Sequence, residues 1–460
     1  MPIRSSRGGP IGPALRFARR YRPSPEAALE RTGSGRRRTT WSITDQALSS
    51  LTNFALTIVV ARSATVGAFG AFELTASIYL FFVGGARAVS AEPLMVRHSD
   101  DPADTVATAA GQSTGVALVV GLAAGAVCVA VGTLLDDPSR AAMQALGLCL
   151  PGLLLQDAWR YTFFAAGRPA KAAANDALWA VTQVVVLAWL LWTGDPSIAV
   201  FVLAWGGSAT IAAAAGLLQS GVVPRPGDVR LWLRRHRDLA PRFLGEFGVG
   251  LGTAQLSLWL IGVLGGLAVL GAIRAATVLI GPFRILLIAA PGAAIPELVR
   301  MRNTSLPRFT RAVAVTSWAL AGLIGVWGVG VYLLPESVGE LILGDSWEPA
   351  REVLLLVTLS WSALGIATGA LIGLRVLAAA RQSFRARLVI APAVLVTSVV
   401  SVQLGGLTGA ATGLAAVSCG SAVVWTIQFR SALREASTGE RPPADQPPEP
   451  PILDGPGPPE

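Results

Sequence analysis

The chain has 460 residues, of which 52% are hydrophobic and 14% are charged, and its formal net charge is +9. Soluble domains carry about 25% charged residues, so this composition argues against a soluble enzyme and favours a protein with many membrane-spanning segments. The basic charge comes from 36 arginines and one lysine, Lys171, and fits either a nucleic acid or a membrane face as the partner.

The sequence lacks the spacing of several common catalytic and metal sites. The only lysine follows an alanine, whereas a P-loop needs a lysine between glycine and serine or threonine, so the chain is not a P-loop ATPase. The two histidines and three cysteines stand too far apart to suggest a metal site. Residues 111–115 match the GxSxG of a hydrolase nucleophile, but they lie in an apolar stretch that is typical of one membrane helix. We interpret Gly111 and Gly115 as a GxxxG spacing for close helix packing.

The composition of both terminal segments predicts that they are disordered. Residues 1–40 contain ten arginines and two glutamates among Pro, Gly and Ser, as in a disordered basic arm. This arm either lies along anionic lipid headgroups or is a solvated tail without a role. Residues 431–460 are rich in Pro and acidic residues and predict a second disordered tail.

Between the tails the hydropathy predicts an all-helical membrane protein with about twelve spans, each about 20 residues long. The spans are 42–62, 68–90, 107–134, 141–166, 174–193, 197–220, 242–264, 268–292, 309–334, 352–374, 387–404 and 406–428.

The distribution of arginines among the loops predicts on which side of the membrane each loop lies. The loops after the fourth, sixth, eighth and tenth spans are basic, whereas most of the remaining loops are acidic or neutral. Because cytoplasmic loops carry an excess of Lys and Arg, we expect both termini to be cytoplasmic in a bacterial plasma membrane. The loop at 91–106 fits least well, because it combines Arg97 with three aspartates. Topology therefore explains the basic charge, and no nucleic acid is expected as a partner.

A weak internal repeat divides the spans into two sets. A shift of 201 residues places Asp45 on Glu246 and Gly70-Ala71-Phe72 on Gly271-Ala272-Ile273. Because each set has six spans, both sets enter the membrane from the same side, and a pseudo-two-fold axis along the membrane normal relates them. Symmetry of this kind is typical of alternating-access transporters. The predicted parts are the arm 1–40, a first lobe 41–221, a basic cytoplasmic linker 222–241, a second lobe 242–430 and the tail 431–460.

Several short motifs resemble a known family. Asp45-Gln46, Asn53, Ala61-Arg62 and Phe69-Gly70-Ala71-Phe72 resemble the start of the polysaccharide and oligosaccharide-lipid flippases of the multidrug/oligosaccharidyl-lipid/polysaccharide (MOP) exporter superfamily. Leu343-Gly344, Trp347 and Ala350 resemble the stretch before the tenth helix of that family. The resemblance covers most of residues 41–430 and implies two six-helix bundles around a central cavity that opens to each side in turn. It also implies a polyprenyl-pyrophosphate-linked glycan as cargo and other enzymes of envelope-glycan synthesis as partners.

Charged residues within the spans are candidates for function, because a charge at the bilayer centre costs about 2.5–3.5 kcal/mol. They are Asp45, Glu73, Arg87, Asp157, Arg160, Asp176, Glu246, Arg274 and Arg284. Asp157 and Arg160 are three residues apart, which is also the spacing of a local ion pair. Glu73 and Arg274 occupy equivalent repeat positions with opposite charge. We hypothesise that they pair across the lobes and help to close an external gate.

The remaining candidates suggest a headgroup site and a coupling site. Arg284, together with Arg274 and Arg87, is hypothesised to attract an anionic headgroup, because a guanidinium binds a pyrophosphate in a fork. The alternative is that Arg284 binds backbone carbonyls freed by Pro282. Asp45, Glu73 or Glu246 are the acids available for coupling to H⁺ or Na⁺, and the sequence does not choose among them. No cofactor or resident metal is expected.

These observations predict a transporter rather than an enzyme, namely a flippase or exporter of a lipid-linked oligosaccharide or polysaccharide precursor. One alternative is a cation-coupled multidrug exporter of the same fold. A second is a membrane glycosyltransferase or polymer ligase, although such enzymes carry carboxylates on a large external loop and the longest one here, 335–351, is short. A third is a degenerate pair of lobes that serves as a scaffold for envelope synthesis.

Overall fold

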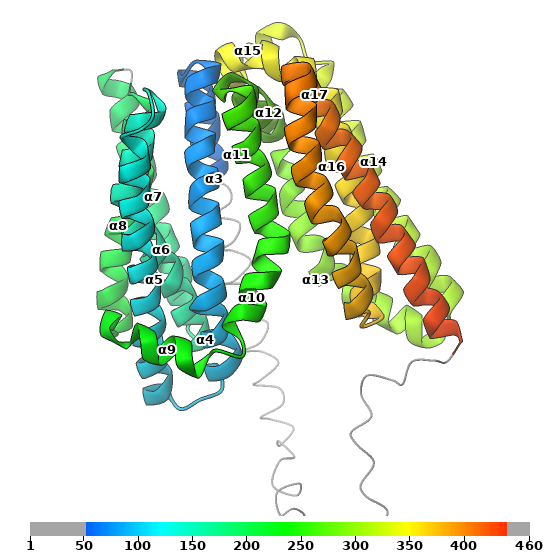
Figure 1. Ribbon diagram of the computed structural model, residues 1–460, viewed down its shortest axis with the longest axis horizontal. Coiled ribbons are helices and arrows are strands. Elements are labelled where there is room, and N and C mark those ends of the chain that lie inside the picture. The colour runs from blue at the N-terminus through cyan, green and yellow to red at the C-terminus, as the bar shows by residue number, and fades with distance from the viewer. Residues whose placement is uncertain (1–51, 195, 439–460) are drawn as a thin grey trace, which may run out of the picture.

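The computed structural model describes residues 52–194 and 196–438, in which every regular element is a helix (Figure 1). The first lobe contains helical residues 52–63, α3 (Val66–Val89), α4 (Ala91–His98), α5 (Ala103–Gly132), α6 (Ser139–Ala165), α7 (Pro169–Thr193) and α8 (Ile198–Ser220). The linker contains η1 (Pro226–Asp228) and α9 (Val229–Arg235). The second lobe contains α10 (Ala240–Phe247), η2 (Gly248–Gly252), α11 (Thr253–Gly265), α12 (Leu267–Leu279), α13 (Gly281–Thr304), α14 (Leu306–Tyr332), α15 (Glu336–Leu343), η3 (Gly344–Ser346), α16 (Trp347–Val376) and α17 (Ala380–Ser437). The basic arm and the end of the acidic tail lie outside the described residues.

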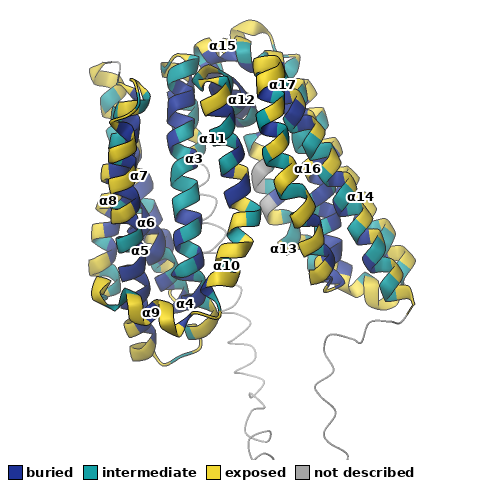
Figure 2. Cartoon of the chain, viewed as in Figure 1, coloured by how far each residue is buried: buried dark blue, intermediate teal, exposed yellow. Residues whose placement is uncertain are grey.

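The helices form a multi-pass membrane protein. Eight described helical segments are long and apolar enough to cross a membrane. Helix α17 holds two passes, because the chain turns back at Gly405 and at Gly406, whose φ of 54° favours glycine. Exposed residues follow the outer surfaces of both lobes (Figure 2), and they include large apolar side chains such as Trp189, Trp192 and Trp318. Hydrocarbon, rather than water, is the solvent in which such a surface is stable.

Small residues hold the helices of the first lobe close together. A Cβ on Gly125 of α5 would lie 2.4 Å from the carbonyl oxygen of Gly147 of α6, and a Cβ on Gly147 would lie 2.6 Å from that of Gly125. The two backbones therefore touch, which only glycine allows at such a crossing.

The prediction of one unbroken eighth span at 268–292 is wrong, because the structure breaks this stretch into two helices and the second helix ends later. The structure divides this stretch into α12 and α13 at Ile280, and α13 continues to Thr304. Pro282 explains the break, because a proline has no N–H to donate to the preceding turn and is favoured at the first positions of a new helix.

The linker lies directly against the first lobe. The N–H of Arg225 donates to the carbonyl oxygen of Gly111 at 2.7 Å, and a Cβ on Gly115 would lie 2.4 Å from the carbonyl oxygen of Arg225. Gly111 and Gly115 thus contact the linker backbone and not a neighbouring helix, so the helix-packing interpretation of this motif is wrong. The sequence shows the small residues but not the partner that approaches them.

Two buried rings anchor the linker further along. Trp232 is fully buried and its Nε1 donates to the carbonyl oxygen of Val89 at 2.8 Å. The ring of His236 packs on that of Trp232 with 3.9 Å between centroids. Burial lowers the pKa of His236, so the neutral ring is the form that fits this site near neutral pH. Arg97 of α4 completes the contact by donating to Asp238 at 2.7 Å.

The two lobes lie together at one end of the molecule, and at the other end several helices of the second lobe lean away from the first (Figure 1). We call these ends the α15 end and the linker end, after the elements that they carry. Toward the linker end α10 stays beside α3, whereas α13, α14 and α17 lean away (Figure 1).

Candidate functional site

Helix α3 of the first lobe packs against several helices of the second lobe. It packs on α12 toward the α15 end and on α10, η2 and α11 toward the linker end. The residues that make these contacts are spaced three or four apart and so share one helix face. They are Gly70, Glu73, Ser77, Phe81 and Gly84.

The closest approach between the lobes is a crossing of α3 and α12 at two glycines. A Cβ on Gly70 would lie 1.8 Å from the carbonyl oxygen of Leu267, and a Cβ on Gly271 would lie 2.2 Å from the carbonyl oxygen of Val66. The two contacts are equivalent, because 66 and 267, like 70 and 271, are separated by the 201 residues of the repeat. The pseudo-two-fold axis therefore passes through this crossing. Replacing either glycine with a residue that has a side chain would push the lobes apart here.

An ion pair lies one turn along from the crossing. The Nε of Arg274 donates to Oε2 of Glu73 at 2.5 Å, and Glu73 is 2% exposed. These two residues are also 201 apart, so the structure brings together the pair that the repeat suggested. Their role in a gate stays a prediction.

We call the contact between the lobes at Gly70, Gly271, Glu73 and Arg274 the seam. The segment after α15 covers this seam. The φ of Gly344 is 56°, and a Cβ there would lie 2.8 Å from the carbonyl oxygen of Arg62. The hydroxyl of Ser346 donates to the carbonyl oxygen of Ala61 at 3.3 Å, and Trp347 is fully buried beside it. A loop of the second lobe thus rests on the end of the first helical segment of the first lobe.

Aromatic contacts continue the seam toward the linker end. The Nε1 of Trp259 donates to the hydroxyl of Ser77 at 2.8 Å, and Phe81 lies 4.9 Å from Trp259 and 5.4 Å from Phe247 between ring centroids. Between these two aromatic residues of the second lobe, Gly248–Gly252 forms a π-helical turn. Turns of this kind bend helices and often occur at functional sites. In this protein the π-helical turn belongs to the segment that packs beside α3, whereas other helices of the second lobe lean away from α3 toward the linker end.

A chain of alternating charges is buried inside the first lobe. Arg87 of α3 donates to both carboxylate oxygens of Asp157 on α6, at 2.8 and 2.6 Å. Arg160 lies 3.8 Å from Asp157 and donates to Asp176 of α7. The two carboxylates are 5% and 1% exposed at their side chains. Buried charges persist in proteins when they are paired and hydrogen-bonded in this way. The local pair of Asp157 and Arg160 exists, but each partner has a closer contact on another helix.

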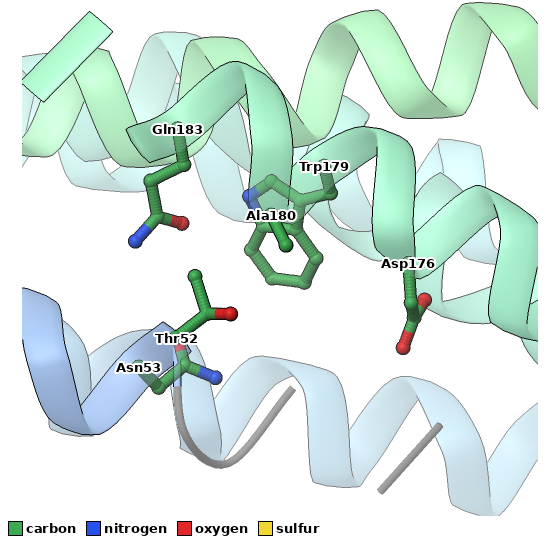
Figure 3. A pocket seen from close by; sticks show the side chains of 6 residues that line it. All are labelled: Thr52, Asn53, Asp176, Trp179, Ala180 and Gln183. Atoms are coloured by element: carbon green, nitrogen blue, oxygen red, sulfur yellow. The ribbon is translucent and has the colours of Figure 1, made fainter. Parts of the chain in front are cut away.

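The chain of charges ends at a small pocket. Asp176 lines it together with Thr52, Asn53, Trp179, Ala180 and Gln183 (Figure 3). The amide of Gln183 faces the side of the pocket formed by residues 52 and 53, and its buried Nε2 has no hydrogen-bond partner within the described residues. A small pocket that contains a buried carboxylate and a buried amide is suited to a water molecule, a proton or a small cation.

The charge inside the two lobes differs. Among the described residues, the buried acidic side chains are Glu73, Asp157 and Asp176, and all three belong to the first lobe. No acidic side chain of the second lobe is buried within the described residues, and its buried polar groups include the hydroxyls of Ser257 and Ser398, which share a 2.6 Å hydrogen bond. The buried amide of Gln382 donates to the partly exposed carboxylate of Glu435 at 2.6 Å.

The other predicted site residues have different surroundings. Asp45 lies outside the described residues, as does the side chain of Arg284, whose backbone belongs to α13. Glu246 has a side chain that is 68% exposed, and it lies 3.8 Å from Arg387 of the same lobe, so this contact does not cross the lobes. Arg87 and Arg274 each contact a carboxylate in this state. Their role toward an anionic headgroup stays a prediction.

Sequence reasoning gave too little weight to Asp157 and Asp176. It noted the spacing of a local ion pair for Asp157 and Arg160, and it listed Asp176 among the charged residues of the spans without assigning it a role. The neighbouring amides Gln156 and Asn175 were the signal, because Gln156 donates to Asp176 at 2.7 Å and Asn175 donates to the carbonyl oxygen of Ala212 at 2.8 Å. Two adjacent polar residues within each of two consecutive apolar spans, Gln156-Asp157 and Asn175-Asp176, indicate a shared buried network.

No protein-family model and no curated protein sequence matches the chain. Solved structures do match it. An inward-facing multidrug resistance MATE family transporter of the MOP superfamily has a TM-score of 0.60 at 14% identity, covering 88% of this chain and 96% of that one. The lipid II flippase MurJ in an inward closed conformation has a TM-score of 0.62 at 11% identity, covering 87% and 91%. An outward-facing MATE family transporter has a TM-score of 0.53 at 12% identity, covering 88% and 96%. The chain therefore has the fold of the MOP exporters.

Proposed function

We propose that this chain is an alternating-access exporter or flippase that moves a lipid-linked oligosaccharide or polysaccharide precursor across a bacterial plasma membrane. The observation that carries the proposal is the equivalent crossing of Gly70 and Gly271. The crossing holds the lobes together at one end while helices diverge at the other. Two lobes that rock about such a seam expose a site between them to each side in turn.

The arginines orient the molecule. The linker end carries the arginine-rich segment 225–242, and the positive-inside rule places it in the cytoplasm. The lobes then diverge toward the cytoplasm and are closed toward the outside. The higher TM-score with the inward-facing MATE transporter than with the outward-facing one supports this assignment.

The seam suggests how an anionic headgroup enters the cycle. While the external end is closed, Arg274 is held by Glu73. A pyrophosphate that reaches Arg274 competes with this carboxylate, because a guanidinium forms the same forked hydrogen bonds with both groups. Binding of the headgroup thus weakens the closed seam, and the empty protein closes it again. The fold that this chain shares with the lipid II flippase MurJ supports a lipid-linked cargo.

A second candidate function is cation-coupled multidrug export. The pocket at Asp176 favours it, because a buried carboxylate beside the buried amide of Gln183 suits a coupling proton or sodium ion. The fold is also that of the MATE transporters.

Mass spectrometry of lipid extracts tests the cargo. Cells depleted of the protein are expected to accumulate a polyprenyl-linked glycan while their tolerance of cationic drugs stays normal. New drug sensitivity without such a lipid would establish the multidrug alternative instead. If neither changes, the transport proposal is rejected in favour of a scaffold.

Exchange of the charges at the seam tests the gate. Glu73→Gln leaves the largely buried Arg274 without its counter-charge, a loss of about 3 kcal/mol, which shifts the closed state about a hundredfold toward the outward-open state. Spin labels at the exposed Leu134 and Leu333, after replacement of the native cysteines, are expected to report a longer distance across the α15 end. The double exchange Glu73→Arg with Arg274→Glu is expected to restore much of the short distance.

A matched control uses an ion pair outside the seam. Glu297 and Arg300 lie 3.0 Å apart with side chains 54% and 76% exposed, and Glu297→Gln is expected to leave the distance unchanged. An unchanged distance in Glu73→Gln would show that the pair does not hold the gate.

A further inference from the structure

The linker presents a basic and apolar surface on the side opposite its anchor. In α9, residues two positions before and after Trp232 point away from it, because successive residues turn by 100°. These residues are Arg230 and Arg234, and both are exposed. Leu231 and Leu233 flank them at 41% and 40% exposure, and Arg237 follows, also exposed. We call Arg230, Leu231, Leu233, Arg234 and Arg237 the linker surface.

The positive charge of this surface is not neutralised within the linker. The segment 225–242 has six arginines and two acidic residues, and both acidic residues have partners elsewhere. Asp228 accepts a hydrogen bond from Gln112 of α5 at 3.2 Å, and Asp238 accepts one from Arg97 of α4 at 2.7 Å. The two acidic groups thus hold the linker on the first lobe and leave the outward arginines to another partner.

The depth of the linker places this surface at the edge of the bilayer. Trp232, which stands between the two leucines, donates to the carbonyl oxygen of Val89, the last residue of α3, and Val66 at the other end of that helix is 23 residues away. Twenty helical residues rise about 30 Å, the thickness of the hydrocarbon core. The leucines are then level with the outermost acyl chains and the arginines with the headgroups, as in an interfacial amphipathic segment.

We propose that the linker surface binds anionic phospholipid headgroups of the cytoplasmic leaflet and that this contact stabilises the linker on the first lobe. The proposal rests on the cytoplasmic assignment of the linker end but not on the cargo. The match is one of charge and depth, since guanidinium groups bind phosphates and the cytoplasmic leaflet is the anionic one.

Hydrogen exchange of the linker amides tests this in the full chain. In nanodiscs of phosphatidylcholine with phosphatidylglycerol, residues 225–238 are expected to exchange at least tenfold more slowly than in phosphatidylcholine alone. The variant Arg230→Gln, Arg234→Gln, Arg237→Gln is expected to lose this difference, whereas replacing the same three by lysine is expected to keep it. The matched control is Arg300→Gln, Arg308→Gln, Arg311→Gln in another basic loop, which is expected to keep the full effect.

Several results would overturn the proposal. Equal exchange in the two lipid mixtures would show that the surface binds no anionic lipid. An equal loss in the control variant would show a general effect of basic charge. Protection by soluble glycerophosphoglycerol in phosphatidylcholine nanodiscs would show a site for free phosphate esters and not for a lipid surface. All three readouts leave glycan export unmeasured, so a failed cargo proposal would not be confused with a failure here.

Discussion

Replacing Gly70 with alanine is expected to prevent closure of the external end. The new Cβ would lie 1.8 Å from a backbone oxygen, that of Leu267, which has no rotamer by which to move away. Helices α3 and α12 must then separate by about 1 Å or more, because packed interiors do not absorb such an overlap. Since the ion pair of Glu73 and Arg274 lies one turn further on, the same displacement weakens it. We expect export to fall at least tenfold and the spin-label distance between Leu134 and Leu333 to lengthen.

The same helix supplies the control for this variant. Gly67 lies one turn before Gly70, and a Cβ there would meet nothing within 4 Å. Gly67→Ala adds the same atom and improves helix propensity by about 1 kcal/mol, so export and closure are expected to be normal. Gly271→Ala is expected to repeat the defect, because its Cβ would lie 2.2 Å from the carbonyl oxygen of Val66. Normal closure in both Gly70→Ala and Gly271→Ala would contradict the assignment of the seam.

The second large effect is expected from Asp157→Asn in the first lobe. Asparagine keeps the shape of the side chain but removes the charge that Arg87 contacts through two hydrogen bonds and that lies 3.8 Å from Arg160. Arg87 then loses the carboxylate that it contacts, while Arg160 keeps its contact with Asp176. Removing one partner from a buried ion pair costs about 3–5 kcal/mol, so the thermal midpoint of the purified protein should fall by several degrees and export should be lost.

Two further variants separate stability from function. Asp136→Asn removes a carboxylate that is fully exposed and 4.0 Å from Arg140, so no change in the midpoint is expected. Arg87→Gln combined with Asp157→Asn removes both members of the pair, and the midpoint is expected to recover, because no unpaired charge stays buried at that position. Export is expected to stay low in the double variant if the ionic chain takes part in transport. Recovery of export with the midpoint would make the chain purely structural.

Much of the architecture could be predicted from composition and spacing. Apolar runs of about 20 residues must cross a bilayer as helices, because every backbone polar group needs a partner there. The repeat offset of 201 was sufficient to suggest that residues 73 and 274 face each other, since a two-fold axis brings together equivalent positions that lie close to it. The break at Ile280 was missed although Pro282 is visible in the sequence, because hydropathy averages over a window and does not detect a lost hydrogen bond.

The candidate site was less predictable, because its partners come from different helices. Arg87, Asp157 and Asp176 lie on α3, α6 and α7, and only packing decides which guanidinium reaches which carboxylate. Spacing along one helix favoured the pair of Asp157 and Arg160, which is the longest link in the chain of charges. Gly111 and Gly115 were likewise recognised as close-packing residues, but the sequence did not show that their partner is the linker backbone.

The sequence by itself determined that this protein is a helical membrane protein with two related lobes, and it predicted on which side of the membrane the arginine-rich loops lie. Those properties follow from local transfer free energies and from symmetry, which do not depend on the details of packing. Only the tertiary structure decided that the lobes close at one end through two glycines, that the charges of the first lobe form one chain, and that the linker is fixed to α5. These features depend on atoms that are far apart in the chain and meet within about 4 Å, and no pattern of single residues specifies such contacts.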